Sequence, residues 1–305
     1  MKTIKVYTCI FTRSEDGPLK PLLDQMRRRR DFEVVVRNIP STTPRLNRIP
    51  LIEWDLKSIR PDLVLCGFDR PEMVDVAYSA YHMNIPIAQI FAGDISGGAF
   101  DDADRFVIST YASLLFCSDE SQFKRLQQSF SWRRSVGESL KVFQVGATHF
   151  DDMDYDIRAV DTTPYALCLY NPPNKGEILE QVYRDVEYIS NKMADWISSD
   201  KIKLVYWVAP NGDYGSEEIE RMAKSMRSVV FLKNMPRERF LGWMKNAKVL
   251  IGNSSCFFYE GCYFAKNVIT VGRRNEWREM AEDCKKGASK KIIEHIRNYF
   301  EESVK

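Results

Sequence analysis

The chain has 305 residues, 44% of them hydrophobic, which is enough for two domains with apolar cores of their own. Its 44 Lys and Arg residues nearly balance its 42 Asp and Glu residues, and the formal charge of +2 argues against nucleic acid or a membrane as a partner. Seven irregularly spaced cysteines and three distant histidines argue against a disulfide framework and predict no metal site, as in a cytoplasmic protein.

Strand-like and helix-like segments alternate over the first half of the chain. The first strand, residues 4–11, turns polar at residue 12, which is typical of a strand rather than a signal peptide. Further strands are predicted at residues 32–37, 63–66, 87–91, 114–117 and 142–145, and helices at residues 19–30, 51–59, 72–83, 103–112 and 121–128. This alternation predicts a parallel sheet flanked by helices, as in a Rossmann-like domain over residues 1–150.

A second alternating series follows an acidic, broken stretch at residues 151–164, which we interpret as a hinge. The predicted strands are 166–170, 203–208, 229–232, 249–251 and 267–271, and the predicted helices are 178–198, 216–225, 237–246 and one starting near 257. They define a second Rossmann-like domain at residues 165–287, and a C-terminal helix occupies residues 288–305. The predicted fold class is therefore α/β, with two Rossmann-like domains and a cleft between them.

Ligands of such sheets bind beyond the carboxyl ends of the strands. The loops at residues 12–17, 67–71 and 92–104 are therefore expected to gather around one cleft.

The segment Gly252-Asn-Ser-Ser255 is typical of a diphosphate-binding turn, because it places small hydroxyl residues between a strand and a helix start. Ser254 and Ser255 would donate hydrogen bonds to phosphate oxygens, and Glu260 would accept the hydroxyls of a ribose. Arg274 and Arg278, after the next strand, would add charge-assisted bonds. An ordinary capped helix is the alternative interpretation of the same segment.

Five segments, at residues 12–23, 61–70, 92–105, 210–216 and 252–278, follow one order of motifs. They include Gly67-Phe-Asp-Arg70, the acidic run Asp101-Asp-Ala-Asp-Arg105 and Pro210-Asn-Gly-Asp-Tyr-Gly-Ser216. This order resembles the UDP-N-acetylglucosamine 2-epimerase family, especially its hydrolysing branch, over nearly the whole chain. The resemblance implies a glycosyltransferase-B-type fold that closes on a nucleotide sugar, without a cofactor or metal, in a homodimer or tetramer.

The resemblance also implies how the residues would act. An acidic residue removes the proton at C2, the nucleoside diphosphate leaves, and a glycal intermediate is hydrated, which requires two acid/base groups. Asp69 matches the first group, and Asp102 or Asp94 would supply the second. The residues expected to bind the substrate are Arg13, Arg70, Arg105, Asn171, Asn211, Asp213, Ser254, Ser255, Glu260, Arg274 and Arg278. For Asp69 a turn cap before Pro71 is the alternative, and for Asp102 and Arg105 a charge-rich helix start.

Three positions depart from the family pattern. Phe91 replaces an ionisable residue, Asn171 replaces a histidine and cannot titrate near neutral pH, and Phe68 replaces the histidine before Gly-Asp-Arg. A phenylalanine would give the sugar pocket an apolar wall. Three functions therefore stay open: a hydrolysing 2-epimerase of a UDP-linked amino sugar, a glycosyltransferase using a nucleotide-sugar donor, and a nucleotide-sugar binding protein that has lost its chemistry.

Overall fold

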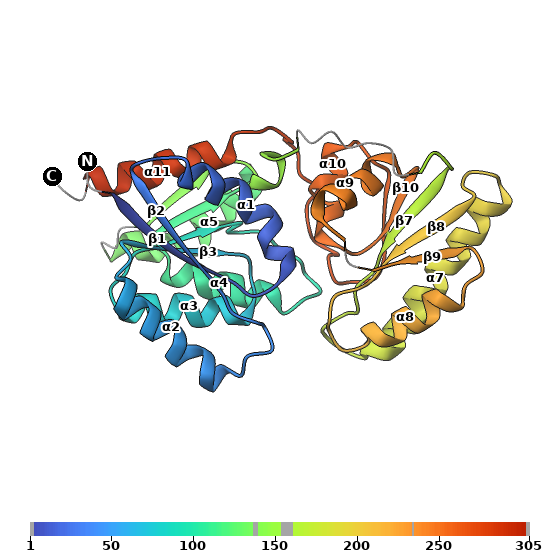
Figure 1. The fold of residues 1–305 in the computed structure, drawn as a ribbon, viewed down its shortest axis with the longest axis horizontal. Helices are drawn as coiled ribbons and strands as arrows, with labels where there is room; N and C mark the ends of the chain where they lie inside the picture. Colours follow the sequence, from blue (N-terminus) through green and yellow to red (C-terminus); the bar gives the residue numbers. More distant parts are fainter. Residues whose placement is uncertain (1–2, 137–139, 154–160, 234, 303–305) are drawn as a thin grey trace. The chain divides into compact units, whose positions relative to one another are not determined.

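The computed structural model describes residues 3–136, 140–153, 161–233 and 235–302, with only the backbone of Arg13, Ser14, Asp16 and Arg134. The chain divides into two compact units (Figure 1). The first unit holds residues 1–94, 101–153 and 282–305, and the second holds residues 95–100 and 154–281. Segment 95–100 thus belongs to the second unit although the residues on both sides of it belong to the first. The C-terminal helix belongs to the first unit although it follows the second in the chain. Part of the predicted hinge, residues 154–160, lies outside the described residues.

The first unit is built on a six-stranded parallel sheet with the strand order β2-β1-β3-β4-β5-β6. Its strands are β1 (Ile4–Ile10), β2 (Phe32–Asn38), β3 (Leu63–Gly67), β4 (Ile87–Ile90), β5 (Leu114–Cys117) and β6 (Lys141–Gln144). Its helices are α1 (Arg13–Arg27), α2 (Arg45–Ile59), α3 (Pro71–His82), α4 (Asp101–Tyr111), α5 (Glu120–Ser129), α6 (Ser131–Ser135) and α11 (Ala288–Glu302), with a 3-10 turn η1 (Thr148–Phe150).

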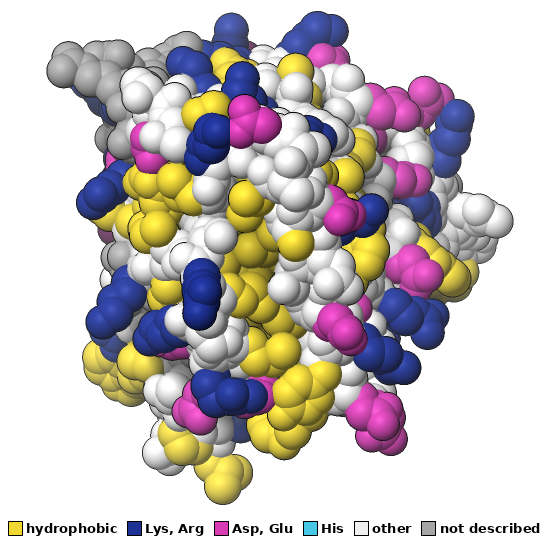
Figure 2. All heavy atoms as spheres, turned by 90° about the vertical axis from the view of Figure 1, so that its right-hand side faces the viewer, with side chains coloured by type: hydrophobic (Ala, Val, Ile, Leu, Met, Phe, Trp, Pro, Cys, Tyr) yellow, Lys and Arg dark blue, Asp and Glu magenta, His cyan; other side chains and the backbone are white. Residues whose placement is uncertain are grey.

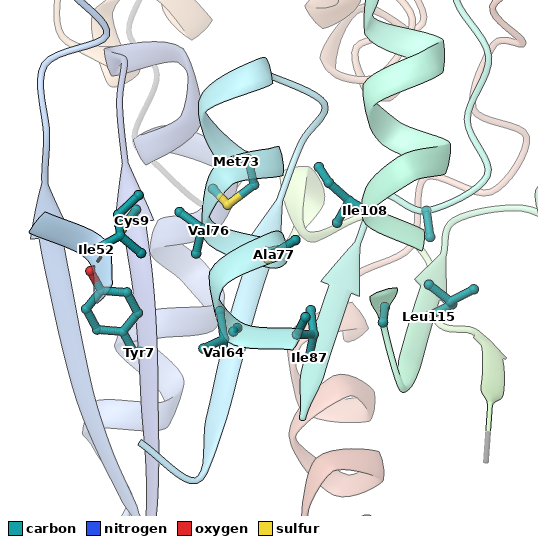
Figure 3. Close-up of a cluster of buried hydrophobic side chains, with 14 of the residues drawn as sticks. Tyr7, Cys9, Ile52, Val64, Met73, Val76, Ala77, Ile87, Ile108 and Leu115 are labelled. Carbon is teal, nitrogen blue, oxygen red and sulfur yellow. Dashed lines mark hydrogen bonds between the residues drawn. The ribbon is translucent and has the colours of Figure 1, made fainter. Parts of the chain in front are cut away.

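Alternating side chains of these strands fill two cores, one on each face of the sheet. Tyr7 and Cys9 of β1 pack with helices α2 to α5, whereas Ile4 and Val6 pack with α1 and α11. Figure 3 shows the first core, where Val76 of α3 lies near the strand residue Val64. Successive side chains of a strand point to opposite faces of the sheet. Because both faces are buried, each strand is a continuous apolar run in the sequence.

Helix α11 belongs to this unit because its apolar side chains pack against α1 and the sheet. Helix α11 lies beside α1 (Figure 1). Ile292, Ile293 and Ile296 are buried in the same core as the apolar face of α1. The carboxylate of Asp151 accepts backbone hydrogen bonds from Gly287 (2.6 Å) and Ser289 (2.7 Å), which satisfies donors at the start of the helix.

The second unit contains a five-stranded parallel sheet with the order β11-β10-β7-β8-β9. Its strands are β7 (Tyr165–Leu169), β8 (Leu204–Val208), β9 (Val229–Leu232), β10 (Val249–Gly252) and β11 (Val268–Thr270). Its helices are α7 (Ile178–Ser198), α8 (Ser216–Ser225), α9 (Arg237–Asn246) and α10 (Glu260–Tyr263), with a 3-10 turn η2 (Ser255–Phe257). The prediction of two parallel sheets flanked by helices is confirmed. Figure 2 shows that Lys and Arg side chains are interspersed with Asp and Glu side chains on one face of the molecule.

Two helix starts, at residues 19 and 51, were predicted a full turn or more too late. Helix α1 begins at Arg13, so residues 13–17 are helical and not the predicted loop. A capping box at Thr12 and Glu15 fixes this start, with the Glu15 carboxylate accepting the N–H groups of Phe11 (2.6 Å) and Thr12 (2.9 Å). Helix α2 begins at Arg45. Its first residues are mostly exposed, so the apolar spacing that is typical of a helix is missing there.

Candidate functional site

In the first unit, one buried arginine gathers the three predicted catalytic residues. The side chain of Arg105 is 2% exposed and forms an ion pair with Asp69, which follows β3. Its Nη1 also donates to the Asp102 carboxylate (2.8 Å) and to the backbone carbonyl of Asp94 (2.7 Å). The loop after β3, the loop after β4 and the first turn of α4 therefore meet at one guanidinium.

The electrostatics of Arg105 are set by these carboxylates. Burial by itself lowers the pKa of Arg105, but the negative charges of Asp69, Asp94, Asp102 and Asp101 raise it well above its usual value. The guanidinium therefore stays charged and holds Asp69 and Asp102 in fixed orientations.

The position of Arg105 depends on a polar contact in the core that the sequence did not reveal. Gln89 of β4 is fully buried and donates from Nε2 to the Arg105 carbonyl (3.0 Å). The hydroxyl of Ser109 donates to the Gln89 side chain at 2.5 Å. A polar residue within an otherwise apolar strand was the available signal, because a buried amide needs partners.

Two further residues predicted for this site have different surroundings. Arg70 is the N-cap of α3, and its guanidinium forms an ion pair with Glu72 in the first turn of that helix (3.1 Å). Arg13 is the first residue of α1, and its side chain lies outside the described part of the chain.

A phenylalanine directly follows each of the adjacent strands β3 and β4. In β3 and β4, Gly67 pairs with Ile90, so the next residues, Phe68 and Phe91, lie opposite each other. Their ring centroids are 5.0 Å apart, and His149 lies 4.8 Å from Phe91. Phe68, Phe91 and His149 thus form one aromatic group next to the strand-end loops that carry Asp69 and Asp94.

In the second unit, Asn171 and Asn253 join the ends of two strands. The Asn253 side chain accepts the Asn171 N–H (2.8 Å) and donates to the Asn171 carbonyl (2.8 Å). Gly252 has φ +144, and a Cβ there would overlap the Leu169 carbonyl, so only glycine allows this approach. The glycine of the Gly-Asn-Ser-Ser motif therefore serves strand packing as well as the turn.

A second set of contacts ties together the loops after β7, β8 and β11. Arg274 donates to the Asp213 carboxylate (2.9 Å) and to the Pro172 carbonyl (2.7 Å). The Asn171 side chain accepts the backbone N–H of Asn211 (2.9 Å), and Asn211 in turn donates to Asp213 (2.6 Å). Four predicted binding residues thus lie in one polar cluster, namely Asn171, Asn211, Asp213 and Arg274.

The prediction of a helix starting near residue 257 is wrong in its form. The chain instead makes the short turn η2 with Ser254 as its N-cap, and then the four-residue helix α10. Three consecutive aromatic residues, at 257–259, are all buried, and successive residues of a regular helix point 100° apart and cannot all face one core. The chain therefore breaks its helix to bury them.

The remaining predicted nucleotide-binding residues lie around this turn. Ser254 is half-buried with its hydroxyl 3.1 Å from the Cys256 sulfur, and Ser255 is exposed. Glu260 is buried and forms an ion pair with Arg237 (2.7 Å), a residue that the sequence did not point to. A buried carboxylate is stable only with a paired cation, and this requirement of Glu260 was the signal that could have indicated Arg237.

Segment 95–100 packs on the strand-end loop of the second unit that contains Arg278. Ser96 accepts a hydrogen bond from the Arg278 guanidinium (2.8 Å) through its hydroxyl, and its carbonyl accepts the N–H of Trp277 (3.2 Å). A Cβ at Gly98 would overlap the Arg273 carbonyl. The pair Gly97-Gly98 was the signal in the sequence for this close backbone approach.

Two parallel sheets with polar clusters at their strand ends define a two-unit α/β protein of the glycosyltransferase-B type. The family model "UDP-N-acetylglucosamine 2-epimerase" matches residues 48–304. The chain belongs to this family, as its motifs indicated.

Curated relatives and solved structures agree with this assignment. The chain is 29% identical over 239 residues to UDP-N,N'-diacetylbacillosamine 2-epimerase (hydrolyzing) of Legionella pneumophila, covering 74% of this chain and 60% of the relative. It is 26% identical to UDP-N-acetylglucosamine 2-epimerase of Neisseria meningitidis, covering 77% and 62%. The chain thus spans about 60% of the length of the curated relatives that it matches.

The solved structures support the fold. A UDP co-structure of MnaA from S. aureus has a TM-score of 0.76 at 17% identity, covering 99% of this chain and 97% of that chain. The Neisseria meningitidis UDP-GlcNAc 2-epimerase bound to UDP-GlcNAc has a TM-score of 0.75 at 16% identity, covering 97% and 100%. Within the described residues, no helix is both long and apolar enough to cross a membrane. The homodimer and the cytoplasmic location stay predictions.

Proposed function

We propose that the protein is a hydrolysing 2-epimerase of a UDP-linked N-acetylated amino sugar, which releases UDP and the 2-epimerised sugar. The observation that carries the proposal is the Arg105 cluster, which holds Asp69 and Asp102 on one buried cation. Family membership supports the same activity, and both relatives named above are 2-epimerases of UDP-linked N-acetylated sugars.

The chemistry requires a base and an acid. Asp69 removes the proton at C2 as the bond between C1 and the diphosphate oxygen breaks, and the electron pair of the C–H bond forms the C1–C2 double bond. Protonated Asp102 or Asp94 then delivers a proton to C2 from the opposite face, while water adds its hydroxyl at C1. The remaining proton of that water restores the acid, and Asp69 releases the proton it took to solvent. Fixed orientation by Arg105 would serve both steps, because proton transfer depends on short, aligned contacts.

We assign nucleotide binding to the second unit. Arg274 and Arg278 supply positive charge, and Ser254 and Ser255 supply hydroxyl donors at the end of β10. Arg274 is already oriented by Asp213 (2.9 Å), so little side-chain entropy is lost when it binds an anion. The three-residue turn η2 offers no long helix, so side chains rather than a helix dipole carry the binding.

A nucleotide-sugar binding protein without turnover is the second candidate. It is favoured by the replacement of ionisable family residues by Phe68, Phe91 and Asn171. A glycosyltransferase would also keep the nucleotide cluster, and it would release UDP only with an acceptor present.

Turnover in heavy water separates these functions. Incubation with UDP-N-acetylated sugars should give UDP and a free sugar carrying deuterium at C2, because C2 is protonated from solvent. Binding without product supports the second candidate, and unlabelled transfer to an added acceptor supports the glycosyltransferase. Asp69→Asn should abolish turnover and leave the Kd for UDP within about twofold, whereas Asp200→Asn, an exposed ion-pair residue of the other unit, is the matched control.

Calorimetry tests the nucleotide cluster. The double variant Ser255→Ala with Glu260→Gln should weaken UDP binding by about tenfold or more, as expected for the loss of two polar contacts. Glutamine is chosen because Glu260 is buried and its amide oxygen can still accept from Arg237. Unchanged UDP affinity in this variant would place the nucleotide site elsewhere.

A further inference from the structure

Residues 94–102 form a loop whose two ends are held by one nitrogen atom. The Nη1 atom of Arg105 donates to the Asp94 carbonyl (2.7 Å) at the start of the loop and to the Asp102 carboxylate (2.8 Å) at its end. Between these ends, residues 95–100 belong to the second unit, whereas Asp94 and the residues from Asp101 onward belong to the first. Both candidate acids, Asp94 and Asp102, therefore lie on a loop whose middle part is held by the second unit.

The middle of loop 94–102 is attached to the second unit at two places. Near its start, Ser96 is 1% exposed and accepts hydrogen bonds from the Arg278 guanidinium (2.8 Å) and, through its carbonyl, from the Trp277 N–H (3.2 Å). At the other end of the segment, the Phe100 N–H donates to the Asn174 side chain (3.3 Å). The loops after β7 and β11 therefore set the position of segment 95–100.

A chain of polar contacts connects Ser96 with the Gly252-Asn-Ser-Ser255 turn. The Nη2 atom of Arg278 donates to Ser96, and its Nε atom donates to the Asn275 side-chain oxygen (2.8 Å). The Asn275 amide in turn donates to the Asn253 carbonyl. Asn275 and Asn253 are both buried, so little water competes for the bond between them. The turn to which we assign diphosphate binding is therefore joined to Ser96 through successive hydrogen bonds.

We propose that Ser96 is a positioning residue that couples nucleotide binding in the second unit to the placement of Asp94 and Asp102. A diphosphate bound by the turn and by Arg278 restricts the motion of that guanidinium. Ser96 and loop 94–102 then become more rigid, and the two carboxylates keep the orientation that proton transfer requires. This inference rests on the proposed function, because it names the residue through which nucleotide binding acts on the proposed catalytic carboxylates.

Hydrogen exchange with and without UDP tests the coupling. In the wild type, saturating UDP should slow the exchange of amides in the first two turns of α4 by about threefold to tenfold, although these amides lie in the first unit. Ser96→Ala should reduce this response to less than about twofold, because Arg278 loses its side-chain contact with the loop. Ser225→Ala, which removes an exposed hydroxyl of α8, is the matched control and should respond like the wild type.

Kinetics with a UDP-N-acetylated sugar separate positioning from a merely structural role. In Ser96→Ala, kcat should fall by about tenfold while KM and the Kd for UDP change by less than about threefold, because the placement of the acid changes and the nucleotide contacts do not. Asn275→Ala interrupts the same chain of contacts nearer to the turn and should also reduce the response of α4 to UDP. This second variant keeps the test decisive if Ser96→Ala does not fold.

The outcomes distinguish the inference from the proposed function. The inference is overturned if UDP binds in calorimetry but leaves the exchange of α4 unaltered, or if Ser96→Ala keeps the wild-type response or the wild-type kcat. If UDP binds and no sugar is turned over, the proposed function fails, and the exchange measurement alone decides the inference. If UDP does not bind, the nucleotide assignment and the inference fail together.

Discussion

Removal of the Arg105 guanidinium should destabilise the first unit strongly. In Arg105→Met, Asp69 and Asp102 lose their cation, and the Asp94 carbonyl loses a charged donor. Breaking a buried ion pair from one side costs about 3–5 kcal/mol. The Asp69 and Asp102 side chains are 20% and 23% exposed, so water compensates in part and we expect the lower end, about 3 kcal/mol.

Hydrogen exchange is the suitable assay, because a chain with two units need not unfold in one step. A loss of about 3 kcal/mol lowers the protection of amides in β3 and α4 by about a hundredfold, while amides of the second unit keep theirs. Arg221→Met, which removes an exposed ion-pair cation in the second unit, is the control and should leave both units unchanged.

A double-mutant cycle checks the cause. If the cost comes from the stranded carboxylate, then Asp69→Asn should be less harmful, or even favourable, when Arg105 is already methionine. Additive effects of the two substitutions, or a loss below about 1 kcal/mol for Arg105→Met, would refute the reasoning, because such a value is typical of exposed pairs.

Three further substitutions test other parts of the structure. Gly98→Ala should detach segment 95–100 from the second unit and increase its proteolysis, whereas Gly212→Ala, with open space around the added methyl group, should not. Burial raises the pKa of Asp185, so its ionisation opposes folding. The free energy of unfolding of Asp185→Asn should therefore rise relative to that of the wild type as the pH increases from about 4. Urea unfolding at several pH values measures this difference, and a difference that does not change with pH would contradict the prediction. Asp213→Asn should loosen Arg274 and raise the Kd for UDP by about threefold to fivefold, and an unchanged Kd would remove this ion pair from nucleotide binding.

The local sequence determined most of the elements. Short continuous apolar runs predicted the strands, and α7, α8, α9 and β9 have the predicted bounds. These patterns are local, because a side chain's direction along a strand or helix follows from its position alone. The same logic predicted buried thiols at Cys9 and Cys66, which the structure confirms.

The tertiary structure decided which side chains meet. Asp69 and Arg105 are 36 residues apart, and only the neighbouring positions of the loop after β3 and of α4 bring them into contact. Likewise, Phe68 and Phe91 became partners because β3 and β4 pair in the register Gly67 to Ile90, and strand order is not written in any local pattern. Glu260 with Arg237 is a third case, since the desolvated carboxylate needed a cation whose position depends on the packing of α9. Local sequence patterns therefore determined the elements and the chemical types at their ends, whereas the contacts between side chains followed from long-range packing.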